Sequence, residues 1–275
     1  MVRVRRHDSV EEFLQVSKVF RGADPVRTGL ISSIAGSVAD GTRKYDGYFW
    51  WTVSREDKVI GIASRTIPYG YVFSPMTNAA IDALSKSIAL EDPEANEFAG
   101  PKTVIDYLVE IAGRKVTESE NELVYQLGAF IPAKINGDVV LATEADFDLV
   151  YSWVRDFIEE TGLRDFDLEN IVRSAVNARR YSLLFVGNIP VSLGGRAGIH
   201  EINGKLVGRV GPIYTPMKFR KHGYASSITS AITQSLLDLG ALPTLYTQAS
   251  NPRSNRIYQD LGYLLVDENR HVIFT

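Results

Sequence analysis

The stretch Arg220-Lys-His-Gly-Tyr-Ala225 lies between two segments whose hydrophobic patterns differ, and its position decides the fold expected for the C-terminal half. Before it, Leu206 to Thr215 is typical of a β-strand, and after it apolar residues recur with the period of an α-helix. That helical face consists of Ile228, Ile232, Leu236 and Leu239, with Ser226, Ser227, Thr229 and Ser230 off it. The order is therefore strand, basic glycine-containing loop and helix N-terminus.

This order predicts an anion-binding site. A helix N-terminus presents unpaired backbone N–H groups and roughly half an elementary positive charge, which together suit a phosphate or pyrophosphate. Gly223 allows the backbone to approach an anion, Ala225 leaves the amides uncovered, and the basic run Arg220–His222 adds positive charge. In the preceding strand, Gly211-Pro212 favours a bulge, so this strand is expected to bend away from its neighbour. Alone, such a loop is more typical of a solvated surface turn.

A second motif follows the strand-like segment Thr244-Leu-Tyr-Thr247. Asn251 is a good N-cap, Pro252 suits the first helical position and Gly262 suits the C-terminal cap, which predicts a short and sharply bounded helix. Tyr258 lies within this helix. Without the capping residues around it, Tyr258 is more typical of a core aromatic residue at helical spacing from its apolar neighbours.

Together, Arg220-x-x-Gly223-x-Ala225 and the later Asn251, Tyr258 and Gly262-Tyr263 resemble the GNAT superfamily of N-acetyltransferases over residues 136 to 275. The strings Gly-Tyr-Ala-Ser and Asn-Pro-x-Ser-Asn-x-Ile-Tyr are similar to bacterial tandem members of that superfamily. The resemblance implies acetyl-CoA as the co-substrate and a reaction without a metal. The residues implied to bind acetyl-CoA are Ile213, Tyr214, Thr215, Arg220, Lys221, His222, Gly223, Tyr224, Ala225, Ser226, Asn251 and Tyr258.

The resemblance also implies a role for each part of this site. The backbone of Ile213–Thr215 would pair with the pantetheine arm, and the amides of Lys221–Ser226 would hold the pyrophosphate, with Arg220 framing the loop. Asn251 would hydrogen-bond the arm. Tyr258 would act as the general acid to the departing thiolate, because a phenol with a pKa of about 10 is protonated at neutral pH. The implied reaction is direct transfer of an acetyl or longer acyl group to a primary amine of a small molecule or peptide.

The group that takes the proton of the amine is not evident. The strand from Leu206 to Tyr214 carries no carboxylate, although many members of the superfamily keep one there. Glu201 and His200, at the end of the preceding strand, are the nearest candidates for the base, although each is typical of a solvated turn. Relay through water to backbone carbonyls is equally open. The missing base also leaves a second function open, a CoA-binding sensor or interaction protein without turnover.

The two halves of the chain follow a similar order of expected elements. Each opens with a strand, a polar turn and a helix, at residues 2–20 and 138–158. The expected hairpins and later helices span 48–67, 78–89 and 102–112 in the first half and 181–197, 225–239 and 252–261 in the second. This self-similarity predicts an α/β fold, or α+β in some schemes, with two GNAT-like units at 1–134 and 135–275. Each unit would be a mixed twisted sheet flanked by helices, with a splayed central strand pair in the second. An unrelated α/β cap is the alternative for the first.

The first half lacks the motifs of the second. Its segment Tyr71–Asn78, where a glycine loop should fall, contains no Arg-x-x-Gly-x-Ala, and Gly100–Tyr107 has the spacing of Asn251–Tyr258 without the asparagine. We therefore predict a degenerate repeat that does not bind CoA and instead shapes the acceptor pocket. Candidate pocket residues are Tyr48, Phe49, Trp50, Trp51 and Tyr69 in the first half and Phe157, Arg164, Asp165 and Phe166 in the second.

Composition narrows the class of protein further. The 275 residues are 45% hydrophobic, and 30 basic against 33 acidic residues give a net charge of -3, without the basic stripe of a nucleic-acid-binding protein. The absence of cysteine excludes disulfides, a thiolate metal site and a protein thiol as acyl carrier. No apolar stretch is long enough to span a bilayer, and the start lacks the apolar run of a signal peptide. We expect a cytoplasmic monomer or homodimer without nucleic-acid or membrane partners.

Overall fold

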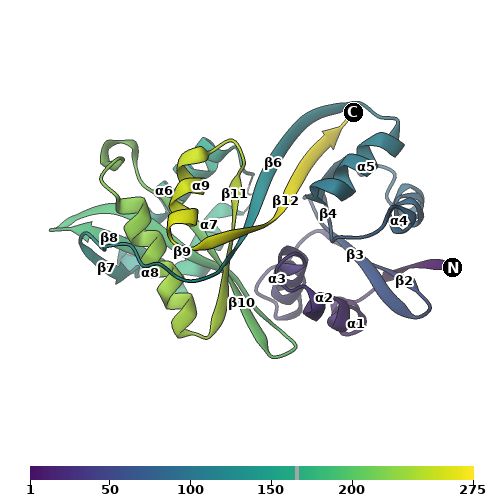
Figure 1. The fold of residues 1–275 in the computed structure, drawn as a ribbon, viewed down its shortest axis with the longest axis horizontal. Coiled ribbons are helices and arrows are strands. Elements are labelled where there is room, and N and C mark those ends of the chain that lie inside the picture. Colours follow the sequence, from purple (N-terminus) through teal and green to yellow (C-terminus); the bar gives the residue numbers. More distant parts are fainter. Residues whose placement is uncertain (165–166) are drawn as a thin grey trace.

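The computed structural model describes residues 1–164 and 167–275 and contains one continuous mixed β-sheet with helices on both faces (Figure 1). In the first half the elements are β1 (Val2–His7), α1 (Val10–Val16), α2 (Lys18–Ala23), α3 (Gly29–Ala39), β2 (Gly47–Arg55), β3 (Lys58–Ile67), β4 (Tyr71–Phe73), α4 (Asn78–Glu91), β5 (Glu97–Pro101), α5 (Lys102–Ala112) and β6 (Val116–Leu127). In the second half they are β7 (Asp138–Leu141), α6 (Phe147–Thr161), α7 (Leu168–Asn177), β8 (Tyr181–Val186), β9 (Ile189–Ile202), β10 (Lys205–Tyr214), α8 (Tyr224–Asp238), β11 (Ala241–Gln248), α9 (Pro252–Asp260) and β12 (Tyr263–Phe274), with short 3-10 turns at Glu144–Asp146 and Met217–Phe219. The fold is thus of the mixed α/β class expected from the sequence.

The order of the strands is the same on the two sides of the sheet's centre. The twelve strands run β1-β2-β3-β4-β5-β12-β6-β11-β10-β9-β8-β7. From the central pair β12 and β6 outward, each side of the sheet contains the fifth to the first strand of one half, in that order. The last strand of each half lies next to the fifth strand of the other half, so the halves exchange their last strands. In Figure 1, β6 and β12 accordingly run side by side between the halves. A repeated unit with exchanged last strands would produce this order. The repeat and the units 1–134 and 135–275 stay predictions.

Hydrophobic clusters hold the helices against the two faces of the sheet. On one face, α4 and α5 pack over one cluster and α8 and α9 over another, and the pairing of β6 with β12 places both clusters on the same side. On the other face, α1 and α3 cover a cluster around Trp50, and α6 and α7 cover a cluster around Leu193. Between these last two groups of helices, the central strands carry polar side chains such as Glu97, Glu120 and Glu122.

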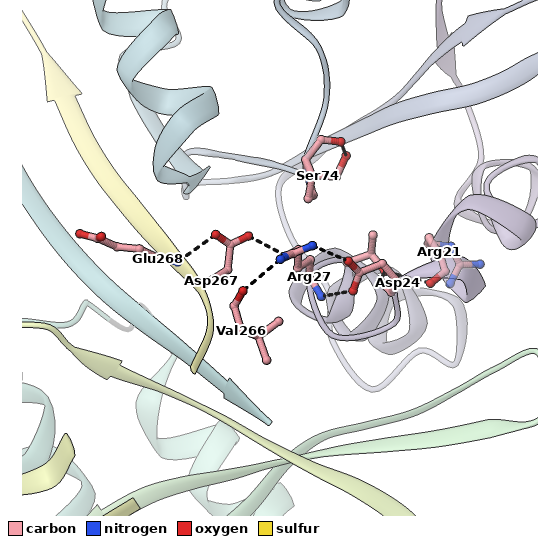
Figure 2. Close-up of polar contacts among 9 residues, drawn as sticks. Arg21, Asp24, Arg27, Ser74, Val266, Asp267 and Glu268 are labelled. Carbon is pink, nitrogen blue, oxygen red and sulfur yellow. Dashed lines mark hydrogen bonds and ion pairs between the residues drawn. The ribbon is translucent and has the colours of Figure 1, made fainter. Parts of the chain in front are cut away.

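A bulge in β12 anchors the turn between α2 and α3. The register of β12 against β6 shifts between Leu265 and Asp267, so Val266 has no partner in this ladder. Arg27 Nη2 donates to the Val266 carbonyl at 3.0 Å, and its Nε lies 2.9 Å from Asp267 Oδ2 (Figure 2). Arg27 Nη1 also lies 3.2 Å from Asp24 Oδ2. This contact ties the N-terminal helices to a strand that comes from the second half of the chain.

The connection between β6 and β7 contains the join predicted near residue 135, and it packs along α8. The Ala133 N–H donates to Ser230 Oγ at 3.1 Å, and the Asn136 N–H donates to Ser227 Oγ at 3.3 Å. Ser227 Oγ in turn donates to the Lys134 carbonyl at 3.0 Å. The hydroxyl side of α8, which the sequence places off the apolar face, is therefore buried by the connection.

Several elements differ from the sequence expectation. The single helix expected up to Phe20 consists of α1 and α2, which meet at Ser17, where the hydroxyl donates to the Phe13 carbonyl at 2.6 Å. The sequence pattern predicts neither α3, α7 nor β12, and α3 contains only apolar residues, Gly and Ser, so no charged face marks its period. β6 includes the polar residues 116–122, which have no strand pattern of their own, because β12 pairs with it as far as Val116. Among the described helices, none has the length and apolar character needed to cross a membrane.

Candidate active site

The pairing of β10 with β11 stops halfway along both strands. Their parallel ladder ends at the pair Arg209 and Thr244, whereas β10 continues to Tyr214 and β11 to Gln248. Beyond this point β10 pairs with β9 and β11 pairs with β6, so the edges that face each other keep free backbone groups. The predicted splay is confirmed. The irregularity expected at Gly211-Pro212 is confirmed as well, because the β9–β10 register shifts across it.

The loop Arg220–Gly223 leads from the splayed strands into the N-terminus of α8. Gly223 is the N-cap with a φ of +79°, and Lys221 has a φ of +69°, a left-handed conformation that is uncommon for a residue with a side chain. The amides of Tyr224–Ser226 begin the helix and have no carbonyl one turn earlier within it. The first turn of α8 contains no acidic residue. This helix end therefore keeps the positive potential that a phosphate requires.

The side chain of Arg220 links the loop to the end of β10 and to α6. Its Nε donates to the Thr215 carbonyl at 2.8 Å, and its Nη2 lies 2.5 Å from Glu160 Oε2 near the end of α6. Glu160 also accepts a hydrogen bond from Tyr214 Oη at 3.3 Å, so the end of β10, the loop and α6 are linked. The structure thus places Arg220 where it frames the loop, and its contact with a phosphate stays a prediction.

Packing brings the loop and the second motif together. His222 is exposed and stacks on Tyr224 with 5.5 Å between ring centroids. Ile213, Tyr224 and Tyr258 all pack against the same hydrophobic cluster beneath α8 and α9. Lys221 is exposed on the outer side of the loop. Residues predicted from motifs about forty positions apart in the chain therefore border one region of the fold.

Tyr258 projects from α9 toward this cluster. Its ring lies 6.4 Å from that of Tyr125 and 6.2 Å from that of Tyr263, measured between centroids. Burial raises the pKa of the Tyr258 hydroxyl to about 12. No hydrogen bond joins this hydroxyl to any residue that the structure describes. Tyr258 is thus protonated at neutral pH and free to donate to a ligand.

Two asparagines at the start of α9 have different environments. Asn251 is exposed, and its Oδ1 accepts from the Ser254 N–H at 3.1 Å, as expected of the predicted N-cap. Asn255 is only 9% exposed, and its Nδ2 donates to the carbonyls of Gln248 and Ala249 at 3.4 and 3.5 Å. Its Oδ1 is buried without a partner among the described residues. Such an acceptor costs free energy unless a ligand supplies a donor.

Asn255 is therefore a candidate binding residue that the sequence analysis missed. Its position three residues before Tyr258 puts both side chains on neighbouring positions of one helix face. The three-residue spacing of Asn255 and Tyr258 could have predicted this role for Asn255, although the N-cap at Asn251 offered a simpler interpretation of the motif.

A cavity of about 1410 Å³ opens between the two halves, on the face of the sheet opposite α8 and α9. Its walls come from the N-terminal helices with the loop that follows them and from residues within 162–164 and 167–181, and its floor comes from the central strands. Arg209 and Gly211 of β10 line it, so the cavity reaches the point where β10 and β11 separate. An acceptor pocket shared by both halves requires a space of this kind.

Charged side chains on β6 and β10 face this cavity. Burial and the neighbouring Glu120 raise the pKa of Glu122, although Arg209 and His271 act in the opposite direction. The side-chain amide of Gln248 donates a hydrogen bond to Glu120 and does not bond to Glu122. These carboxylates were not predicted from the sequence, because the polar part of β6 resembles a connection and no local pattern shows which strand pairs with it.

The predicted base candidates line the same cavity near the tip of the β9–β10 hairpin. Glu201 is exposed there. His200 Nδ1 lies 2.5 Å from the Gly198 carbonyl oxygen, and its Nε2 is buried without a partner in the described part of the chain. Burial lowers the pKa of His200, and the charges of Arg209 and Arg21 lower it further, so the ring is held neutral. The assignment of Glu201 as the base stays a prediction.

The residues predicted for the acceptor side are divided between the cores and the cavity. Trp50 and Trp51 are 2% and 1% exposed and belong to cores on opposite faces of the sheet. Tyr69 and Arg164 line the cavity, and Arg164 Nη2 lies 2.6 Å from Glu97 Oε1. Three more pack against hydrophobic cores: Tyr48, Phe49 and Phe157. Asp165 and Phe166 lie outside the described residues.

Comparison of the sequence with known families matches the part of the chain that contains the splayed strands and both motifs. Residues 197–272 match the family model described as FR47-like protein. No curated protein sequence matches the chain. The match begins within β9 and ends within β12, so it includes the loop before α8 and Tyr258.

Several solved structures that are similar to the whole chain are described as GNAT proteins. An acetyltransferase of the GNAT family from Colwellia psychrerythraea aligns with a TM-score of 0.64 at 12% identity, over 99% of this chain and 100% of the other. A GCN5-related N-acetyltransferase from Sphaerobacter thermophilus aligns with a TM-score of 0.63 at 14% identity, over 99% and 95%. A tandem GNAT protein from the clavulanic acid biosynthesis pathway aligns with a TM-score of 0.60 at 8% identity, over 100% and 98%. At these identities the likeness establishes the GNAT fold, and the activity must be argued from the site.

Proposed function

We propose that the protein is an N-acyltransferase that moves an acetyl group, or a longer acyl group, from acyl-CoA to a primary amine. The observation that carries this proposal is the pair of free backbone edges where β10 and β11 separate, next to the N-terminus of α8. An extended ligand with amides of its own can complete such edges as an added strand does. The pantetheine arm of CoA has two amides between its pyrophosphate and its thiol, so it fits this arrangement.

The residues around the gap suit the successive parts of acyl-CoA. The main chain of Ile213–Thr215 would pair with the arm, and the loop Arg220–Gly223 with the first amides of α8 would hold the pyrophosphate. The orphaned Oδ1 of Asn255 would accept an N–H of the arm. Asn251, which is exposed at the start of α9, is the second candidate for such a contact.

Tyr258 would act on the sulfur that leaves. Its pKa of about 12 lies roughly 3.5 units above that of an ordinary thiol at about 8.5. Complete proton transfer from an isolated phenol to the thiolate would therefore be uphill by about 5 kcal/mol. Donation of a hydrogen bond while negative charge develops on sulfur is the larger part of its role, worth about 1.5 to 3 kcal/mol for a charged acceptor. The sulfur then gains its proton as CoA leaves.

The acceptor amine would attack the thioester directly. The chain has no cysteine, so no protein thiol can carry the acyl group between donor and acceptor. The cavity gives an amine access to the separation point of β10 and β11 from the face opposite α8. Holding both reactants at that point supplies much of the rate acceleration in a reaction of this type.

Binding of CoA tests the donor site. Gly223→Glu puts a carboxylate where the phosphates would lie, and we expect at least a hundredfold weaker binding of CoA in isothermal titration calorimetry. Gly240→Glu is the matched control, because Gly240 has a φ of +72° with open space around it and follows the far end of α8. This control should bind CoA within threefold of the unmodified protein. Absence of CoA binding, or equal affinity in all three proteins, would overturn the donor site.

Turnover distinguishes an enzyme from a CoA-binding sensor. Release of free thiol from acetyl-CoA should depend on an added amine and should be detected with a thiol reagent across a broad amine panel. Tight CoA binding without amine-dependent thiol release from any member of the panel would favour the sensor.

A further inference from the structure

Glu122, on the floor of the cavity, is a carboxylate without a hydrogen-bond or ion-pair partner among the residues that the structure describes. It lies on β6 between Gln248 of β11 and Asn269 of β12, and both of these neighbours are neutral. It forms no hydrogen bond or ion pair with any described residue. Glu120, two positions earlier on the same face of β6, is instead held by Gln248. A largely buried carboxylate in this situation is stabilised only when a cationic group comes to it.

Arg209, on the same floor, is a guanidinium without a hydrogen-bond or ion-pair partner among the described residues. Its Cζ lies 5.6 Å from the ring centroid of Tyr246, and in the described part of the chain it makes neither a hydrogen bond nor an ion pair. A guanidinium carries five N–H donors, so this side chain has unused capacity for an anion. Arg43 lies near enough to interact with it electrostatically, which adds positive charge at this end of the floor.

The two unpaired groups flank the place where acyl transfer would occur. Arg209 is the last residue of β10 that pairs with β11. Glu122 pairs with the last residue of β11, beyond the separation point. The charge of each acts on the other, although no ion pair within 4.0 Å joins them. The floor of the cavity therefore has one acidic and one basic group separated by a gap that a ligand can bridge.

We propose that Glu122 and Arg209 form the acceptor site, so that the acceptor is a primary amine that also carries an anionic group. The proposal rests on the proposed function and names the acceptor class for the same site. Glu122 binds the ammonium group and takes its proton, and Arg209 binds the anion. Because β6 belongs to the first half of the chain and β10 to the second, each half supplies one of the two charges.

The chemical step then balances without a further reactant. The acceptor ammonium gives one proton to the Glu122 carboxylate, which passes it to solvent through the cavity. The neutral nitrogen forms a bond to the acyl carbon, and the bond from that carbon to sulfur breaks. The nitrogen loses its second proton, the thiolate gains one while the Tyr258 hydroxyl donates a hydrogen bond to it, and one proton in total is released. The products are the amide and free CoA thiol.

Several groups facing Glu122 set the pH at which it works. Burial and Glu120 raise the pKa of Glu122, whereas Arg209 on β10 and His271 on β12 lower it. Tyr246 on β11 is neutral, because burial raises its pKa to about 12. Since the carboxylate must be ionised, kcat/KM should rise with pH through the raised pKa of Glu122. Removing Glu120 should shift this rise to lower pH, and removing Arg209 should shift it to higher pH.

Matched pairs of amines test the anionic group. Acetyl-CoA is the donor, and each pair differs by one carboxylate or phosphate: glycine and methylamine, phenylalanine and phenethylamine, lysine and cadaverine, and phosphoethanolamine and ethanolamine. We expect the anionic member to have at least tenfold higher kcat/KM, and the pairs show whether carboxylate or phosphate is preferred. In Arg209→Gln this preference should vanish while CoA affinity stays within threefold. Preference for the members that lack the anionic group, or turnover of no pair by a protein that binds CoA, would overturn the proposal.

The pair Glu122→Gln and Glu120→Gln tests the proton acceptor. With the best amine, Glu122→Gln should lose at least a hundredfold in kcat/KM and should lose the acid limb of the pH profile. Glu120→Gln should keep activity within about fivefold and should keep an acid limb shifted to lower pH. Both variants should bind CoA and melt like the parent. Unchanged kcat/KM in Glu122→Gln, or equal losses in both, would overturn the role of Glu122. If the parent protein itself does not bind CoA, the proposed function is overturned instead.

Discussion

Replacing Tyr258 by phenylalanine separates its chemical role from its structural one. The hydroxyl has no hydrogen-bond partner among the described residues, so its removal leaves no group unsatisfied. The free energy of unfolding should therefore change by less than about 0.5 kcal/mol. The lost hydrogen bond to the departing thiolate is worth about 1.5 to 3 kcal/mol, and at 1.36 kcal/mol per factor of ten this predicts a 10- to 150-fold lower kcat.

Tyr263→Phe is the matched control, because it removes the same atom from a neighbouring ring. The Tyr263 hydroxyl lies 2.7 Å from Thr233 Oγ1 in the core, 6.2 Å ring to ring from Tyr258. Its loss should lower the free energy of unfolding by about 1 to 2 kcal/mol and leave kcat within threefold.

Thiol-release kinetics and urea denaturation of both variants give the two quantities. The pH dependence adds a further check, since a donor with a pKa of about 12 stays protonated and produces no alkaline limb below pH 10. A Tyr258→Phe variant with kcat within threefold of the parent would refute the assignment. A variant that lost activity only in proportion to lost stability would refute it as well.

Three further predictions concern binding and stability. Asn255→Ala should weaken CoA binding about tenfold in calorimetry, about 1.4 kcal/mol, whereas Asn251→Ala should lower the free energy of unfolding by about 1 kcal/mol through loss of a helix cap. Ser227→Ala should lower that free energy by about 1 to 3 kcal/mol in urea denaturation, because two backbone groups of the β6–β7 connection lose their partner. Burial opposes ionisation of Glu97, yet its hydrogen bond with His271 and a nearby arginine lower its pKa overall. This stabilisation is present above the unfolded pKa of about 4.3 and lost as pH falls through the lower folded pKa. Glu97→Gln should therefore destabilise the protein by about 1 kcal/mol at pH 7, and this difference should shrink as the pH falls below about 4.3.

Local patterns predicted most of the elements that carry the donor site. The helix after the glycine loop, expected over 225–239, is α8 at Tyr224–Asp238, and the helix expected over 252–261 is α9 at Pro252–Asp260. Both have strong local signals, a glycine N-cap in one and an Asn-Pro start in the other. Capping, turn chemistry and periodicity act between residues close in the chain, so they are visible without the fold.

The pairing of strands that are distant in the chain could not be predicted from local sequence patterns. β12 and the polar end of β6 have weak patterns of their own, and they become strands because each completes the ladder of the other. Which strands lie at the centre of the sheet depends on the exchange of last strands between the halves, an arrangement that no short stretch of sequence encodes.

The sequence by itself determined the parts of the site that belong to single segments: the basic loop Arg220–Gly223, its helix N-terminus, the bulge at Gly211-Pro212 and the tyrosine at Tyr258. Only the tertiary structure decided that Glu122 and Arg209, 87 positions apart in the chain, share the floor of one cavity and form no hydrogen bond or ion pair with the described residues. The physical reason is that a cap or a turn forms its hydrogen bonds with residues close in the chain. A charge, in contrast, stays unpaired only when no distant segment of the folded chain brings it a partner.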